Sequence, residues 1–334
     1  MTAAPALSVE GLSVEFRTRS GIVRALDNVG FSVAKGETIA LVGESGSGKS
    51  VTAYAVLGIL DPAGRVTAGR AMLGGLDLLS AKPRELAEVR GREIAMIFQN
   101  PRTALNPIRT VGRQIADVLI RHANVPRGEA QAQAVEMLRA VGITDPARRA
   151  KAYPFEMSGG MCQRVMIACA LAAKPSLLIA DEPTTGLDVT TQAVIMDLIG
   201  DLAGKLGMAT IFITHDLALA GQRAARIVVM HAGHVVENAP TRELFEHPRH
   251  PYTAELIAAT PDSAASLDEL ASVPGSLPDL RRTDLPPCRY SERCPRKASD
   301  CDRPLPSSTD AAHLVACWNP LPMNGPLRAP ESVS

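Results

Sequence analysis

The first third of the chain alternates apolar and polar residues in short runs, a pattern typical of half-buried β-strands. The runs LSVEF, VGFSV and ETIALVG are separated by Gly and Asn turns and predict strands near residues 12–16, 29–33 and 37–43. A helical pattern begins at Lys49, and residues 70–98 predict further short strands around a charged helix.

The pattern then changes. Residues 100–172 have helical spacing and little strand content, so they predict an inserted helical subdomain. Strand-like runs return over residues 176–183, 208–216 and 226–237, with a helical run over 190–206 between the first two. Because strands that alternate with helices form parallel sheets with crossover helices, we expect an α/β fold built on a mainly parallel sheet.

After about residue 248 the chain becomes rich in Pro, Ser and Arg, so we expect residues 1–247 to form one unit and 248–334 an appended one. Apolar residues make up 46%, charged residues 21%, and the formal net charge is zero, as in ordinary globular proteins. The neutral charge, with only 3% aromatics, argues against a nucleic-acid partner. No apolar run approaches the roughly 18 residues of a membrane span, so we expect a cytoplasmic protein.

Residues 43–50, GESGSGKS, match the phosphate-binding pattern G-x-x-x-x-G-K-[ST] between a predicted strand and a predicted helix. The glycines let the backbone turn its N–H groups toward phosphate oxygens, Lys49 supplies a positive charge, and Ser50 offers a hydroxyl to Mg²⁺. A plain Gly/Ser turn is the weaker interpretation of the full motif in this context. The expected nucleotide contacts are Gly43, Glu44, Ser45, Gly46, Ser47, Gly48, Lys49, Ser50 and Val51.

A nucleotide-hydrolysing site also needs a carboxylate at the end of a buried strand, and SLLIADEP supplies two. We expect Asp181 to bind the Mg²⁺ shell and Glu182 to act as the general base that orients water. An Asp-Glu pair alone is usually a solvated turn, but the upstream loop favours the functional interpretation.

The stretch YPFEMSGGMCQRV resembles the signature sequence of ATP-binding-cassette (ABC) proteins. Ser158, Gly159 and Gly160 would form a second anion-binding turn at a helix N-terminus, and the resemblance implies that it faces the ATP of another subunit. Met161 stands where the commonest signature has Gln. The SGGM-x-QRV form is similar to that of the ATPase subunits of dipeptide, oligopeptide and nickel importers.

The resemblance extends to further elements in order. It implies that Gln99 contacts Mg²⁺ and the coupling helices of membrane subunits, that Asp188 belongs to the D-loop, and that His215 binds the γ-phosphate. It also implies that Phe16 stacks on adenine, although a strand Phe is more often a core residue. The implied fold is a P-loop cassette with a parallel core, an antiparallel β subdomain and the helical subdomain.

Four of the six cysteines lie near the end of the chain with spacings C-x5-C-x6-C-x15-C, after an HPYT segment that resembles those importers. Four thiolates can hold zinc or an iron–sulfur cluster, and the absence of C-x2–4-C knuckles disfavours zinc. The resemblance implies a [4Fe–4S] cluster; reduced thiols or a disulfide are the alternatives. The expected ligands are Cys288, Cys294, Cys301 and Cys317, whereas Cys162 and Cys169 are expected to pack in a helix.

Together the motifs imply an ATPase subunit of a peptide importer, bound peripherally to the cytoplasmic face of the membrane. Its implied partners are a second cassette subunit, either a copy or a paralogue, two membrane permease subunits and, indirectly, an extracytoplasmic binding protein. Nickel or another small solute is the alternative cargo. A soluble cassette ATPase acting on DNA or ribosomes, or a P-loop GTPase or kinase, explains fewer of the motifs.

Overall fold

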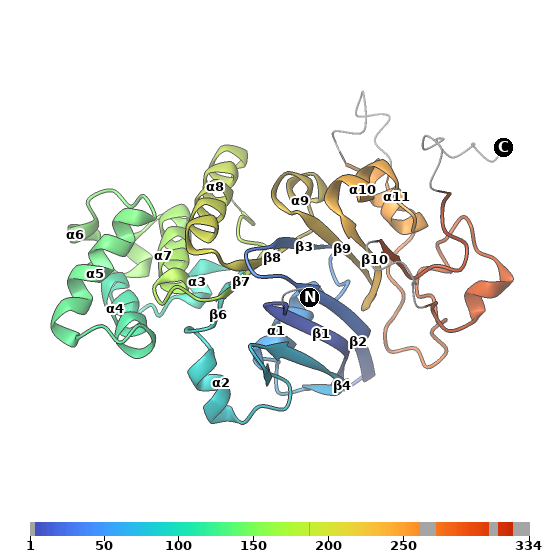
Figure 1. The fold of residues 1–334 in the computed structure, drawn as a ribbon, viewed down its shortest axis with the longest axis horizontal. Coiled ribbons are helices and arrows are strands. Elements are labelled where there is room, and N and C mark those ends of the chain that lie inside the picture. The colour runs from blue at the N-terminus through green and yellow to red at the C-terminus, as the bar shows by residue number, and fades with distance from the viewer. Residues whose placement is uncertain (1–3, 187, 261–271, 307–312, 323–334) are drawn as a thin grey trace.

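The structure is a computed structural model of the 334-residue chain, and it describes residues 4–186, 188–260, 272–306 and 313–322. Two sheets form its centre. A helical block (residues 101–171) lies at one end of the long axis, and the C-terminal segment (residues 248–260, 272–306 and 313–322) lies at the other (Figure 1).

The main sheet has the strand order β11-β10-β9-β3-β8-β7-β6. The five strands from β9 to β6 run parallel, whereas β10 is antiparallel to β9 and β11 is antiparallel to β10. The parallel strands are almost fully buried, as expected for strands covered on both faces. The strands are β3 (Thr38–Val42), β6 (Ile94–Ile97), β7 (Leu177–Asp181), β8 (Ala209–Thr214), β9 (Arg226–His231), β10 (His234–Pro240) and β11 (Leu314–Val315).

A smaller antiparallel sheet with the order β2-β1-β4-β5 packs beside it, as the sequence predicts. The run predicted over residues 12–16 belongs to a longer strand that begins before it. Gly11 adopts a positive φ of 62° at a register shift, and this bulge lets the strand continue through the glycine. The strands are β1 (Leu7–Thr18), β2 (Gly21–Val33), β4 (Gly64–Leu73) and β5 (Leu76–Asp77).

Most of the predicted insertion is helical, and α4 to α6 form the outer part of the helical block (Figure 1). Within the described residues no helix is both long and apolar enough to cross a bilayer. The helices are α1 (Lys49–Leu57), α2 (Pro83–Val89), α3 (Pro101–Ala104), α4 (Val111–His122), α5 (Arg127–Ala140), α6 (Pro146–Arg149), α7 (Gly159–Leu171), α8 (Val189–Leu206), α9 (Leu217–Arg223), α10 (Thr241–Glu246) and α11 (Pro251–Ala258), with the 3-10 turns η1 (Pro154–Glu156) and η4 (Ser299–Asp302).

Two hydrophobic clusters lie on opposite faces of the main sheet, because successive side chains of a strand alternate between its faces. Ile39 and Leu41 of β3 join the cluster that the antiparallel sheet and α1 cover. Ala40 and Val42 join the cluster that contains the helical block, α8 and α11. The end of β3 is therefore held from both sides, immediately before the predicted phosphate loop.

In its described parts the C-terminal segment packs against the rest of the chain. The predicted strand run at 226–237 is a hairpin, β9–β10, because Ala232 and Gly233 turn the chain with φ of 47° and 85°. Leu314 and Val315 then pair with β10 and extend the main sheet.

Candidate functional site

The phosphate loop follows β3 and ends at the first residue of α1, as the sequence predicts. Gly43 has a φ of 149°, and a Cβ there would lie 2.1 Å from the carbonyl oxygen of Met230. Gly48 precedes the helix with a φ of 104°. These backbone positions need glycine, because an L side chain would meet both the left-handed conformation and the neighbouring chain. Ser45 and Gly46 form the exposed tip of the loop.

Lys49 lies inside the curve of this loop. Its ammonium group donates hydrogen bonds to the carbonyl oxygens of Gly43 and Glu44 over 2.7 and 2.9 Å. Burial lowers the pKa of Lys49 from its usual value, while Glu182 and Asp181 act in the opposite direction. The loop therefore presents a desolvated positive charge beside its backbone N–H groups, which suits a phosphate.

Asp181, the last residue of β7, meets Ser50 on α1. The Ser50 hydroxyl donates to Oδ1 of Asp181 over 2.9 Å, whereas the buried Oδ2 has no hydrogen-bond partner among the described residues. Burial raises the pKa of Asp181. A buried, partly unpartnered carboxylate beside a hydroxyl is a donor set that fits Mg²⁺, and the role of these two residues as its ligands stays a prediction.

Glu182 is held by one side chain of its own loop and by side chains from two other segments. Gln99 donates to its Oε2 over 2.8 Å and Thr185 over 2.9 Å, and Nδ1 of His215 lies 3.1 Å from Oε1. Burial alone would raise the pKa of Glu182, but the bonds from His215 and Thr185 lower it below its usual value. Glu182 also adopts an unusual positive φ of 43°, the kind of local strain found at functional sites.

The three predicted catalytic residues thus converge. Gln99 lies 83 positions and His215 33 positions from Glu182 along the chain. Gln99 donates to Glu182, and its predicted role as a Mg²⁺ ligand stays a prediction. The His215 ring is 65% exposed, which leaves it accessible to a bound nucleotide.

The signature residues lie at the start of α7. Ser158 caps this helix by accepting a hydrogen bond from the Met161 N–H over 3.3 Å, and Gly159 and Gly160 begin the first turn. The buried Gln163 donates to the carbonyl oxygen of Pro183 over 2.6 Å, which ties α7 to the segment that follows Glu182.

The remaining predicted contacts lie apart from this cluster. Asp188 caps α8 through the N–H and hydroxyl of Thr191. Phe16 on β1 is partly buried and packs on Gly64 of β4, where an added Cβ would lie 2.6 Å from its ring. Its predicted role in stacking on adenine stays a prediction.

Several residues outside the predicted set also support this site. Thr185 donates to Glu182 over 2.9 Å. Tyr252 and Arg293 reach Glu44 of the phosphate loop from the C-terminal segment. Position in the sequence could not reveal them, because polar residues in α11 and in a proline-rich segment carry no nucleotide-binding pattern.

The four C-terminal cysteines line one small cavity, together with His250, Tyr290 and Trp318 among others. Burial raises the pKa of Cys288 and Cys294 to about 11, and neighbouring cysteines add to the effect. However, the described residues contain no group of three or more His, Cys, Asp or Glu side chains that could hold a metal ion. The structure therefore supports the gathering of the thiols but not the predicted iron–sulfur cluster.

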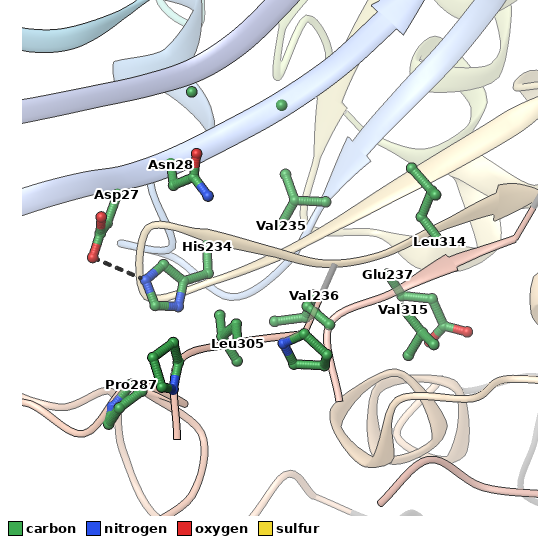
Figure 2. A pocket seen from close by; sticks show the side chains of 15 residues that line it. Asp27, Asn28, His234, Val235, Val236, Glu237, Pro287, Leu305, Leu314 and Val315 are labelled. Carbon is green, nitrogen blue, oxygen red and sulfur yellow. Dashed lines mark hydrogen bonds and ion pairs between the residues drawn. The ribbon is translucent and has the colours of Figure 1, made fainter. Parts of the chain in front are cut away.

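A wider cavity of about 630 Å³ is lined by residues of β2, β10 and the C-terminal segment. Figure 2 shows Asp27 and His234 facing each other at its edge, with Pro287 and Leu305 from the C-terminal segment opposite. Oδ2 of Asp27 lies 3.3 Å from Nε2 of His234. No residue of the phosphate loop is among those that line this cavity.

Comparisons with known proteins agree with this geometry. Residues 26–185 match the ABC transporter family, and residues 236–301 match the oligopeptide/dipeptide transporter C-terminal region. A solved dimeric ATP-binding cassette in a post-hydrolysis state, bound to ADP and phosphate, superposes with a TM-score of 0.63 at 29% identity, covering 71% of this chain and 99% of that one.

Curated relatives match over nearly their whole length. A probable peptide ABC transporter ATP-binding protein of Sinorhizobium fredii is 47% identical over 93% of this chain and 94% of its own. The dipeptide transport ATP-binding protein of Bacillus subtilis is 44% identical with the same coverage, and that of Escherichia coli is 47% identical over 88% of this chain and 90% of its own. The chain therefore belongs to the family of ATP-binding subunits of peptide ABC transporters.

Proposed function

We propose that this chain hydrolyses ATP to energise the import of peptides, as a peripheral subunit at the cytoplasmic face of a membrane ABC transporter. The observation that carries the proposal is the convergence on Glu182 of Gln99, Thr185 and His215, beside the Ser50–Asp181 pair. The family membership supplies the transport role, since the relatives are named for peptide and dipeptide transport.

In this proposal the N–H groups of residues 43–51 and the Lys49 ammonium bind the phosphates of ATP. Ser50 and Asp181, with Gln99, would hold Mg²⁺, which neutralises charge on the β- and γ-phosphates when bound. Glu182 has its pKa lowered and stays ionised, so it accepts a proton from the attacking water. His215, held by Glu182, donates to the γ-phosphate.

The signature turn acts on a second cassette subunit. Ser158 is exposed at the N-terminus of α7, and its hydroxyl oxygen accepts a hydrogen bond from Met161 of the same helix. Support comes from the solved cassette of the same fold, which is a dimer with bound ADP and phosphate. ATP would lie between the loop of one subunit and Ser158, Gly159 and Gly160 of the other, with Asp188 near the same interface.

A groove of about 450 Å³ between α1, α2 and the helical block is the docking site for a short helix of a permease subunit. Phe98, adjacent to Gln99, lines it, with the apolar Met96, Leu105 and Val118 on its wall and Arg109 and Asp117 among its charged groups. The membrane partner would then lie next to Gln99, which donates a hydrogen bond to Glu182. Two permease subunits would dock on the two cassettes, and the extracytoplasmic binding protein would act through them.

The four C-terminal thiols are proposed to bind a [4Fe–4S] cluster, with zinc as the alternative. Support comes from Cys288, Cys294, Cys301 and Cys317 lining one cavity, although in the described arrangement they form no metal-binding group. Anaerobically purified protein should be brown and contain iron. A variant with all four cysteines replaced by serine should contain no iron. A colourless, zinc-loaded protein would favour the alternative, and a metal-free protein would reject both.

The function is tested by Glu182→Gln in the complex with its permease subunits. We expect ATP binding to persist and steady-state hydrolysis to fall at least about a hundredfold, because the general base is lost. Glu246→Gln, at an exposed glutamate of α10, should leave hydrolysis unchanged. Hydrolysis by Glu182→Gln near the wild-type rate would reject the assigned base. Peptides, and not nickel, should stimulate the wild-type complex; binding of the chain to DNA or ribosomes would favour the soluble rival.

A further inference from the structure

The C-terminal segment grips the phosphate loop at Glu44. The Arg293 guanidinium donates two hydrogen bonds to this carboxylate, from Nη1 to Oε2 over 2.7 Å and from Nη2 to Oε1 over 3.0 Å. The Arg293 side chain is only 6% exposed. Bidentate pairs of this kind are strong and directional, because two parallel bonds fix the relative orientation of both groups.

A second contact holds the backbone of the same residue. The N–H of Glu44 donates to the hydroxyl oxygen of Tyr252 on α11 over 3.0 Å. Tyr252 is completely buried, so its ring cannot shift without disturbing the core. The Glu44 carbonyl oxygen, in turn, accepts from Lys49. The carboxylate and the N–H of Glu44 are thus held by the C-terminal segment, and its carbonyl oxygen is held by Lys49.

Arg293 is itself fixed from several directions. Its Nε donates to the carbonyl oxygen of Pro274 over 2.7 Å, and its Nη1 lies 3.2 Å from Nε2 of His231. Burial keeps His231 neutral by lowering its pKa to about 3, so this ring nitrogen can accept from the guanidinium. Several partners therefore fix the buried Arg293 guanidinium in place, unlike an exposed surface ion pair. We call its bidentate contact with Glu44 the clamp.

The neighbouring Arg289 anchors the same short segment to the cassette. It is 3% exposed and donates to the carbonyl oxygens of Arg24 and Ala232 over 3.0 and 2.5 Å, and to Asp27 over 3.2 Å. Leu277, earlier in the segment, lies 3.3 Å from the position of a Cβ on Gly46. The contact between segment and loop thus extends from Glu44 to the loop tip.

We propose that Arg293 is a positioning residue for ATP, which holds the phosphate loop in its binding conformation through Glu44 and makes the C-terminal segment part of the nucleotide site. The proposal rests on the proposed ATP site in residues 43–51. A loop whose entry residue is fixed needs less ordering when phosphate binds, so loss of the clamp weakens ATP binding more than it slows the chemical step.

The test measures ATP affinity by isothermal titration calorimetry and hydrolysis kinetics in the permease complex for Arg293→Gln, Glu44→Gln and the double variant. We expect each single variant to raise the Kd and KM for ATP about tenfold with kcat within about twofold. The double variant should be no weaker than either single one, because both remove the same pair. Arg293→Lys should recover part of the affinity, since it keeps the charge and loses the fork.

The matched control is Arg282→Gln, because within the described residues Arg282 forms its ion pairs with Asp284 and Glu292 of its own segment. It should change the Kd less than about twofold. Lys49→Ala separates the two hypotheses: if it abolishes ATP binding, the ATP site stands whatever Arg293 does. The inference is overturned if folded Arg293→Gln, verified by circular dichroism, binds ATP within about twofold of wild type, or if the two single effects add.

Discussion

The Ser50 hydroxyl donates a 2.9 Å hydrogen bond to Oδ1 of Asp181, so the first turn of α1 and the last residue of β7 meet although 131 residues separate them. The second carboxylate oxygen of Asp181 is buried without a hydrogen-bond partner in the described part of the chain. This arrangement leaves one buried carboxylate oxygen without a hydrogen bond, and the bond from Ser50 connects the loop to the strand that precedes Glu182.

Replacing Asp181 with Asn should therefore separate nucleotide binding from its dependence on Mg²⁺. We expect hydrolysis to fall at least about a hundredfold, because the neutral amide cannot balance the metal charge. ATP binding measured in EDTA should stay within about threefold of wild type. Asp197→Asn, at an exposed aspartate of α8, is the control and should leave both properties intact. Mg²⁺-dependent hydrolysis that survives in Asp181→Asn would reject this role.

Two glycine-to-alanine changes should have opposite effects. Gly43→Ala would place its Cβ 2.1 Å from the Met230 carbonyl oxygen at a φ of 149°, so we expect lost ATP binding and a lowered melting temperature. Gly200 lies inside α8 with no atom within 4 Å of an added Cβ. Gly200→Ala should raise the free energy of unfolding by about 0.5–1 kcal/mol, because alanine favours the helix. Urea denaturation of both variants measures the difference.

The buried ring of His231 should make the protein less stable in mild acid. Burial lowers its pKa to about 3, while the unfolded chain takes up a proton near a pKa of about 6.5. Between these values the unfolded state binds more protons, so the free energy of unfolding falls as the pH decreases. From pH 7 to pH 5 we expect a loss of about 2 kcal/mol from this residue. His231→Gln should flatten that slope in urea titrations; parallel pH profiles would contradict the assignment.

Glu237 should be a strong contributor to stability despite its charge. It is fully buried on β10, accepts from the N–H groups of Arg249 and His250 over 2.7 and 2.9 Å, and lies 2.6 Å from Nε2 of His313. Glu237→Ala should lower the free energy of unfolding by about 3 kcal/mol, because buried donors lose their acceptor. Glu246→Ala, which breaks an exposed pair with Arg242, should cost at most about 0.5 kcal/mol. Equal losses in the two variants would contradict this view.

Local motifs were enough to predict the phosphate loop, the strand that ends in Asp181 and the capped start of α7. In each case the relevant groups are close together in the sequence, so a short stretch such as residues 43–50 contains the complete phosphate-binding motif. The parallel sheet also followed from local patterns, since a buried strand such as Leu177–Asp181 is apolar along its length.

Tertiary structure alone decided which side chains meet. Gln99 and His215 reach Glu182 because β6, β7 and β8 lie side by side in the main sheet, an order that no local pattern states. Arg293 and Glu44 are 249 positions apart in the sequence. They meet because the C-terminal segment packs on β9, where Arg293 also contacts His231. Sequence periodicity reports which face of an element is buried, whereas the partner across that face is set by how the elements pack. The motifs therefore indicated which residues form the predicted phosphate loop, and the fold showed which distant side chains contact it.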